Sequence, residues 1–133
     1  MKREIKFRGK EFETGQWIEG SLTTYPRYYP TITLVEDAEP IPKKTTCVVL
    51  PETVGQLSEI TDKNGNSIFE HDLILIHESE SSYQFTVEVL FHKGMFCYKN
   101  KACGFTPLWY VSDRCEVIGN VFDNPELLKG DKS

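Results

Sequence analysis

The chain has 133 residues, of which 39% are hydrophobic and 26% charged, and its formal net charge at pH 7 is −5. This length fits one domain with its own core, and this composition excludes a largely disordered chain. The acidic balance excludes a strong non-specific grip on nucleic acid, because that grip depends on neutralising phosphate charges. We expect a single domain over residues 1–133, ordered over residues 1–128 and ending in a tail at residues 129–133.

The start of the chain is basic but carries no targeting signal. Residues 2–10 read KREIKFRGK, without the apolar segment that is typical of a signal peptide. No apolar run approaches the roughly 18 residues that a membrane-spanning helix requires. We therefore expect a cytoplasmic protein without membrane partners.

The cysteines do not follow a zinc-binding pattern, because no two of them form a C-x-x-C pair. We expect Cys47 and the other three to be free thiols, packed mostly as small apolar side chains. The alternative is a zinc site in the second half of the chain, where a hairpin could bring ligands together. Its ligands would be His92, Cys97, Cys103 and Cys115.

The first half of the chain alternates predicted strands with turns. Period-two patterns and β-branched residues predict strands over residues 4–8, 16–24, 31–35 and 45–50. The last of these, TTCVVL, reads as an apolar strand buried on both faces. Residues 36–44 form a polar connection with two prolines, which is the expected flexible loop.

The central stretch, residues 51–74, carries the clearest turn signals. Gly55 closes a predicted tight turn in which it adopts a positive φ. Asn64-Gly65 predicts a two-residue hairpin turn that places Ile60 opposite Ile68 or Phe69. A second turn at residues 70–72 leads into a buried strand over residues 73–76.

The second half continues the β pattern. Residues 83–91 alternate strictly and predict one long strand, which turns at Gly94 and pairs with residues 95–98. Residues 105–112 predict a short helix, capped by Thr106, with an aromatic strand as the alternative. A strand with a bulge at Gly119 and a short helical turn after Asn124 complete eight or nine strands. This count predicts an all-β barrel or a pair of small sheets.

The sequence contains no recognisable catalytic motif. The G-x-S-x-G elbow and the phosphate-binding glycine loops are missing. The loop at residues 62–67 has oxygen donors at alternate positions, but Leu73 stands where a calcium loop has its closing Glu. We therefore expect no enzyme activity, no cofactor and no metal. The alternatives are a divalent-ion site formed by the acids Glu70, Asp72, Glu78 and Glu80, and a metal-dependent hydrolase. The hydrolase would need His71, Asp72, His77 and Glu78 to converge in one pocket.

A basic edge with nearby aromatic residues is the remaining candidate for binding. Cations and stacking rings together are how small β domains hold single-stranded nucleic acid. The alternatives are a charged edge strand that resists aggregation and a loop that folds its rings over the sheet. The candidate contacts, for nucleic acid or a protein partner, are Lys6, Arg8, Lys10, Trp17, Tyr25, Tyr28 and Tyr29.

Several runs of the sequence resemble the YopX family of small proteins encoded by bacteriophages and prophages. The central stretch contributes PETVGQ at 51–56, DKNG at 62–65 and IFEHDLI at 68–74. IKFRGK at 5–10, the segment 17–20 and EVIGNVFDNPELL at 116–128 agree as well, in the right order. One departure is His71, which stands where the family commonly has Gly.

The resemblance implies a mainly β, compact single domain with an SH3-like barrel element, built from short antiparallel strands and one or two short helical turns. It also implies an intracellular setting in a bacterium and self-assembly, but no activity and no functional residues. We expect a non-enzymatic phage or prophage accessory protein that acts in the host cytoplasm as a homo-oligomer and binds an unknown phage or host protein. The alternatives are a single-stranded nucleic-acid-binding β-barrel and a metal-dependent hydrolase.

Overall fold

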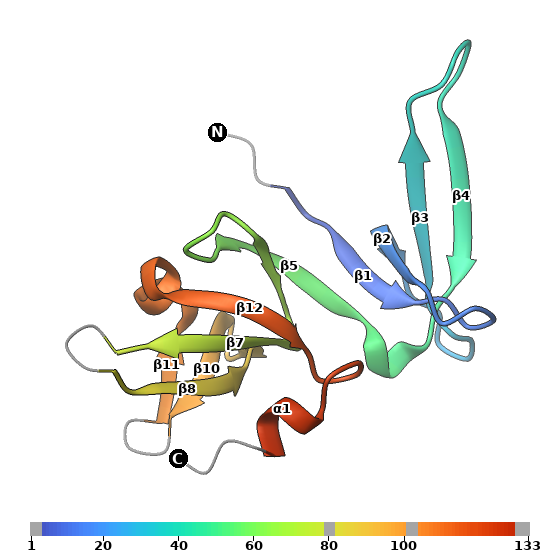
Figure 1. Ribbon diagram of the computed structural model, residues 1–133. Coiled ribbons are helices and arrows are strands. Elements are labelled where there is room, and N and C mark those ends of the chain that lie inside the picture. The colour runs from blue at the N-terminus through green and yellow to red at the C-terminus, as the bar shows by residue number, and fades with distance from the viewer. Residues whose placement is uncertain (1–3, 79–81, 101–103, 130–133) are drawn as a thin grey trace. The chain divides into compact units, whose positions relative to one another are not determined.

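The computed structural model describes residues 4–78, 82–100 and 104–129 (Figure 1). These residues form twelve strands, two 3-10 helices and one short α-helix, so the predicted mainly β class is confirmed. The chain divides into two compact units, Met1–Leu57 and Ser58–Ser133. The single domain over residues 1–133 stays a prediction, and all of the expected tail except Lys129 lies outside the described residues.

The first unit contains β1 to β4 and the start of β5, which belong to a six-stranded sheet in the order β4-β3-β2-β1-β5-β6, where β6 is Ser67–Phe69. Two residues of β5 pair with β1, Gln56 with Phe7 and Gly55 with Arg8. Ile32 and Val49 are fully buried and form the centre of this unit's apolar packing. Its elements are β1 (Phe7–Lys10), β2 (Trp17–Thr23), β3 (Thr31–Glu36), β4 (Lys43–Val48), a 3-10 helix (Pro51–Thr53) and the start of β5 (Gly55–Thr61).

The prediction that residues 45–50 are buried on both faces is wrong. Within this segment β4 alternates between half-buried and exposed residues, and Val48 is exposed. The reason is position: β4 is the outermost strand of the sheet, so among the described residues β3 is its only neighbouring strand. Val49, just after the strand, is the residue that enters the core.

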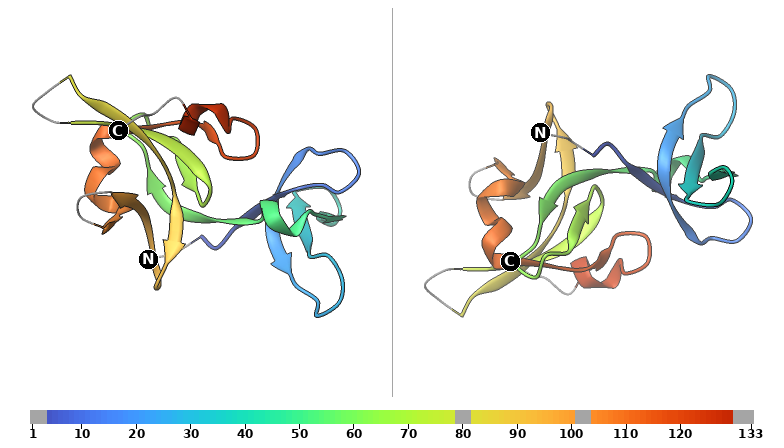
Figure 2. Two further views of the ribbon diagram at one scale, coloured as in Figure 1. Left: turned by 90° about the horizontal axis from the view of Figure 1, so that it is seen from below. Right: turned by 90° about the horizontal axis from the view of Figure 1, so that it is seen from above.

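The second unit contains two three-stranded antiparallel sheets, β12-β7-β8 and β11-β10-β9. Its core is a cluster of buried side chains that includes Ile68, Ile74, Tyr98, Leu108 and Cys115. The 3-10 helix before β12 (orange) and α1 (red) lie on different sides of this unit (Figure 2). Its elements are β6 (Ser67–Phe69), β7 (Asp72–His77), β8 (Gln84–Glu88), β9 (Leu90–His92), β10 (Met95–Asn100), β11 (Gly104–Pro107), the 3-10 helix (Leu108–Arg114), β12 (Cys115–Asn120) and α1 (Glu126–Lys129).

The hairpin turn at Asn64-Gly65 forms, but with three loop residues instead of the predicted two. The Asp62 N–H donates to the Asn66 carbonyl (2.9 Å), and the Gly65 N–H donates to the Asp62 carbonyl (3.0 Å). Gly65 has a φ of 83°, whereas Asn64 is not left-handed. This is a turn followed by a left-handed glycine, the usual form of the three-residue hairpin. Ile60 packs against the core cluster that contains Ile68, as expected.

Three other local predictions need correction. Gly55 is buried at the start of β5 and not left-handed, because the chain turns through the 3-10 helix before it. The expected long strand over residues 83–91 is interrupted at Val89, which is fully buried between β8 and β9. Residues 105–112 are a strand and then a 3-10 helix that begins at Leu108, and no side chain caps this helix.

The remaining turn predictions are confirmed. Lys93 and Gly94 have positive φ values, and β9 and β10 pair across them. The register of β12 against β7 shifts between Val117 and Gly119, as expected for a bulge.

The twelve described strands exceed the predicted eight or nine, and their sheets are open, so the SH3-like barrel element is not confirmed. None of the described helices has the length and apolarity to span a membrane.

Candidate functional site

The predicted basic residues and Trp17 do come together in the first unit. Lys10 lies opposite Trp17 in the β1–β2 register. The Arg8 guanidinium carbon is 4.7 Å from the centre of the Trp17 ring, and the Lys10 Nζ is 5.4 Å from it. Lys6 instead forms ion pairs with Glu19 (3.1 Å) and Glu4 (3.8 Å).

These contacts change how the basic edge is interpreted. The cations lie over the ring on which a base would have to stack, and each such contact is worth about 0.5–1 kcal/mol at an exposed site. Glu19 lies directly opposite Arg8 across the strands and adds negative charge to the same edge. The sequence did not indicate the Glu19 carboxylate as part of the site, because its position opposite Arg8 is set by the register between β1 and β2. Arg8 pairs with Glu19 of β2 on one side and with Gly55 of β5 on the other, so β1 is not an edge strand and the charged-edge alternative is wrong. The ion pairs and ring contacts of these cations give the nucleic-acid alternative no support either.

The predicted tyrosines lie in an exposed loop, and one of them, Tyr29, contacts the exposed Phe12. Tyr28 is 78% exposed, and Tyr25, Tyr29 and Phe12 are between 44% and 54% exposed. Phe12 and Tyr29 pack edge to face with their ring centres 5.5 Å apart. Tyr28 is the ring that is most open to solvent, whereas Tyr25 and Tyr29 are each more than half covered. We call Phe12, Tyr25, Tyr28 and Tyr29 the aromatic cluster.

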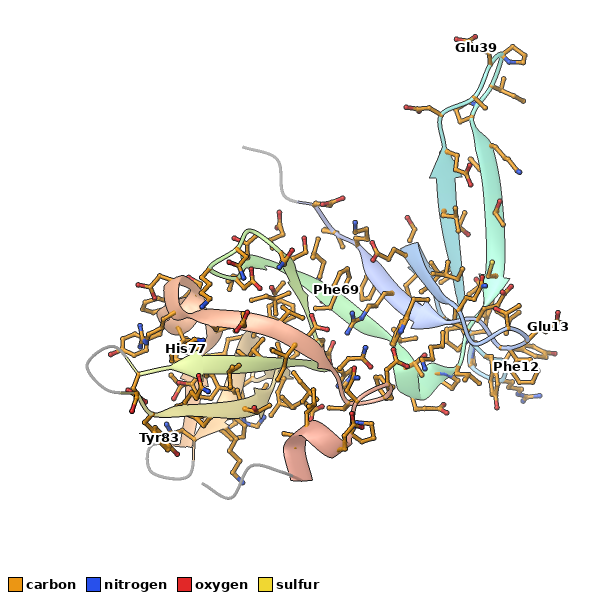
Figure 3. The ribbon with its side chains drawn as sticks, in the orientation of Figure 1. Phe12, Glu13, Glu39, Phe69, His77 and Tyr83 are labelled. Carbon is orange, nitrogen blue, oxygen red and sulfur yellow. The ribbon has the colours of Figure 1, made fainter. Side chains whose placement is uncertain are left out.

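Phe12 was not among the predicted contacts. It lies in the turn between β1 and β2, beside Glu13 (Figure 3). The sequence places it in a turn region, and no local pattern distinguishes an exposed phenylalanine in a turn from one that is folded inward. Its contact with Tyr29 joins two loops that are 17 residues apart in the chain, and only the fold can supply this information.

The residues of the alternative hydrolase site do not converge. His71 precedes β7 and His77 ends it, so about 20 Å of extended chain separates them at roughly 3.3 Å per residue. The Asp72 carboxylate is buried and accepts the Phe69 N–H (2.8 Å), while the His77 Nε2 lies 3.7 Å from Glu116. Within residues 4–78, 82–100 and 104–129, no group of three His, Cys, Asp or Glu side chains could hold a metal ion.

His71 occupies the left-handed turn that the family resemblance suggested. Its φ is 76°. The His71 Nδ1 is 3.0 Å from the Glu88 carboxylate, and its Nε2 is 3.6 Å from Glu70. Its ring also packs edge to face against Phe122 at 5.4 Å. These contacts hold a residue in a conformation that glycine adopts at lower cost.

We expect the His71→Gly variant to be more stable than His71→Ala by about 1 kcal/mol, because both lose the imidazole contacts but only Ala keeps a Cβ at positive φ. Urea unfolding of both variants measures the difference. The same pair at His77, which ends strand β7, is the control, and there Gly should be the less stable by about 0.5–1 kcal/mol. A more stable Ala variant at position 71 would contradict the account.

Two of the cysteines proposed as zinc ligands are core residues. Cys97 and Cys115 are fully buried, and Cys103 lies outside the described residues. Burial raises the pKa of the Cys115 thiol to about 11, and the nearby Asp62 carboxylate adds to the rise. Burial also raises the pKa of Cys97. A thiol binds zinc as the thiolate, so a raised pKa makes zinc binding at neutral pH less favourable.

The second unit contains a pocket of about 480 Å³ that the sequence did not indicate. Tyr98 and Val111, which are buried core residues, contribute to its lining. Pro107, Trp109 and Tyr110 also line it, and the last two are more than half exposed. Burial raises the pKa of the Tyr98 hydroxyl, and a hydrogen bond with Thr106 partly offsets the rise. The volume is within the range of small-ligand pockets, but polar side chains such as Asn100 and Thr106 share the lining with the aromatic ones.

Two opposite charges line the same pocket. Glu78 follows β7, and Arg114 ends the 3-10 helix. The Arg114 guanidinium carbon is 5.0 Å from the Tyr110 ring centre, and its Nη1 donates to the Tyr110 carbonyl (3.2 Å). The same nitrogen lies 3.2 Å from the exposed Asp113 carboxylate. The pocket thus has an apolar aromatic part and one charged group of each sign.

The whole chain can be compared with known proteins. The fold is similar to that of EF1440 from Enterococcus faecalis, with a TM-score of 0.62 and 21% identity over 94% of this chain and 98% of that one. It is equally similar to yopX from Bacillus subtilis, with a TM-score of 0.61 and 22% identity over 96% and 98%. No match was found among the curated proteins. The YopX protein family model matches residues 6–129, and the chain therefore belongs to the YopX family.

Proposed function

We propose that the protein is a non-enzymatic binding module, encoded by a bacteriophage or prophage, that works as a homo-oligomer in the cytoplasm of its bacterial host. It contacts a phage or host protein through the aromatic cluster. The exposure of this cluster is the observation that carries the proposal, since exposed aromatic patches are typical of protein-binding surfaces. The separation of His71 and His77 gives no support to the hydrolase alternative.

The aromatic cluster suits a protein partner for two reasons. Tyrosine is enriched in energetic hot spots of interfaces, because it buries a large ring and keeps a hydroxyl for hydrogen bonding. The cluster residues lie in loops, and binding residues are often carried on loops that a rigid sheet supports. The Tyr25 hydroxyl lies 3.4 Å from the Thr31 Oγ1, so this ring is held close to β3.

Self-assembly is tested by light scattering coupled to size exclusion. We expect a mass above the 15.3 kDa of one chain at micromolar concentration. A monomer across the whole concentration range would remove self-assembly from the proposal and leave the partner contact to be tested alone.

The partner contact is tested by affinity capture from host cells, with and without nuclease. We expect the parent chain to capture a partner protein. The double variant Tyr28→Ser with Tyr29→Ser should capture at least ten-fold less of that protein. Tyr83→Ser, at a tyrosine of the second unit that is 50% exposed and so comparable with Tyr29, is the control and should capture normally. Equal capture by all three proteins would contradict the proposed role of the cluster.

Nuclease sensitivity separates the nucleic-acid alternative from this proposal. If capture depends on nucleic acid, Lys6→Ala with Arg8→Ala should weaken binding to a single-stranded oligonucleotide, and binding should fall as salt rises. We expect instead that nuclease leaves the captured protein unchanged.

A further inference from the structure

The tip of the β3–β4 hairpin is unusually apolar for an exposed turn. Residues 39–42 read Glu-Pro-Ile-Pro, and the Ile41 side chain is 72% exposed. Glu39 lies at the end of this hairpin (Figure 3). Acidic Glu36 and basic Lys43 lie opposite each other where the strands end. The tip therefore has two prolines and an isoleucine between an acidic side, at Glu36 of β3, and a basic side, at Lys43 of β4. We call these the acidic arm and the basic arm of the tip.

The pocket of the second unit has the matching properties. The tip is a bend at residues 39–41, and its proline rings and Ile41 side chain form an apolar surface that an aromatic lining can bury. Tyr98, Trp109 and Tyr110 supply such a lining. Arg114 can pair with the acidic arm of the tip and Glu78 with the basic arm, since the two charges of the pocket are opposite in sign, as are those of the tip.

We propose that the tip of the β3–β4 hairpin of one chain inserts into the second-unit pocket of another copy. This inference rests on the proposed self-assembly and names the surfaces that carry it. The contact is heterologous, because one copy gives the tip and the other gives the pocket, and such contacts build rings or open chains of subunits. Charge complementarity selects the second copy as the occupant, since both halves of the match lie on the same sequence.

Two single variants test the contact separately. Ile41→Ser damages only the tip, and Trp109→Ala damages only the pocket. Both side chains are more than two-thirds exposed, so we expect unchanged thermal unfolding of the monomer. At a concentration where the parent chain assembles, each variant should show the mass of one chain. Tyr83→Ser, at a residue that does not line the pocket, is the control and should assemble as the parent does.

Mixing the two variants is the decisive experiment. Ile41→Ser retains an intact pocket and Trp109→Ala retains an intact tip. In the mixture, the tip of Trp109→Ala can therefore insert into the pocket of Ile41→Ser, but the reverse contact cannot form. We expect twice the mass of one chain in the mixture and no larger species. A mixture that stays monomeric overturns the inference, as does either variant assembling alone like the parent.

The outcomes separate this inference from the proposed function. If the parent chain assembles and the variants do so equally, self-assembly stands and the tip-to-pocket contact is wrong. If the parent chain itself is a monomer throughout the concentration range, self-assembly and the contact both fail.

Discussion

Asp62→Asn should destabilise the protein by about 2–4 kcal/mol, because it removes a buried charge that accepts several hydrogen bonds. Asp62 is 4% exposed. Its Oδ1 accepts the backbone N–H groups of Asn64 and Asn66, both at 2.9 Å. Its Oδ2 accepts the Val117 N–H at 2.9 Å and the Asn66 side-chain amide at 3.4 Å. Asparagine has one oxygen instead of two, so its NH₂ group must face a donor.

Urea unfolding at pH 7 measures this loss. Asp113→Asn is the matched control, because that side chain is 82% exposed and should change stability by no more than about 0.5 kcal/mol. Equal stability of the two variants would show that the Asp62 carboxylate does not hold the loop to β12.

The effect should also depend on pH. Burial alone would raise the pKa of Asp62, but the hydrogen bonds from Val117, Asn66 and Asn64 outweigh it and lower the pKa below its ordinary value of 3.8. A lowered folded-state pKa gives stability that is present above pH 3.8 and is lost as pH falls through the folded-state pKa. The parent chain and Asp62→Asn should therefore differ most near neutral pH and converge in acid. A constant difference from pH 7 to pH 2 would contradict this.

Gly20→Ala should cost about 3 kcal/mol, at the upper end of the usual range for overpacking. A Cβ at Gly20, in β2, would collide with the backbone carbonyl of Thr33 in β3. This is backbone and not the end of a flexible side chain, so the two strands must separate. Loss of β2–β3 pairing would then disturb Ile32, which is fully buried.

Thermal or urea unfolding tests this prediction, with Ser21→Ala as the control. Ser21 is the next residue in β2 and is exposed, so removing its hydroxyl should leave stability within about 0.5 kcal/mol. If Gly20→Ala unfolds at the same midpoint as the control, then a Cβ at position 20 does not collide with the Thr33 carbonyl and the prediction is wrong.

The sequence predicted the local features best where one residue determines the backbone. Gly65 and Gly94 marked turns, Gly119 marked a bulge, and the apolar run after Asp72 marked a buried strand. It failed at residues 45–50, where burial depends on whether the strand lies at the edge or in the middle of the sheet. That position is set by pairing with distant residues, which a local pattern does not contain.

The candidate sites show the same division. The tyrosines of residues 25–30 were predicted as a contact surface because aromatic residues beside prolines stand out in the sequence. The contacts of Arg8 and Lys10 with the Trp17 ring depend on the strand register. The sequence therefore predicted that these residues share a surface, but not that the cations lie over the ring. The pocket was missed because it combines residues from β7, β10, β11 and the 3-10 helix, none of which carries a motif.

The order of strands in the sheet β12-β7-β8 has a consequence for synthesis on the ribosome. β7 is the middle strand and is mostly buried, but its neighbour β12 is the last strand to be made. Until residues 115–120 emerge, β7 has one open edge and Asp62 lacks its Val117 partner. Open apolar edges favour aggregation. Nascent chains that stop before residue 115 should therefore depend on chaperones more than nascent chains that include β12.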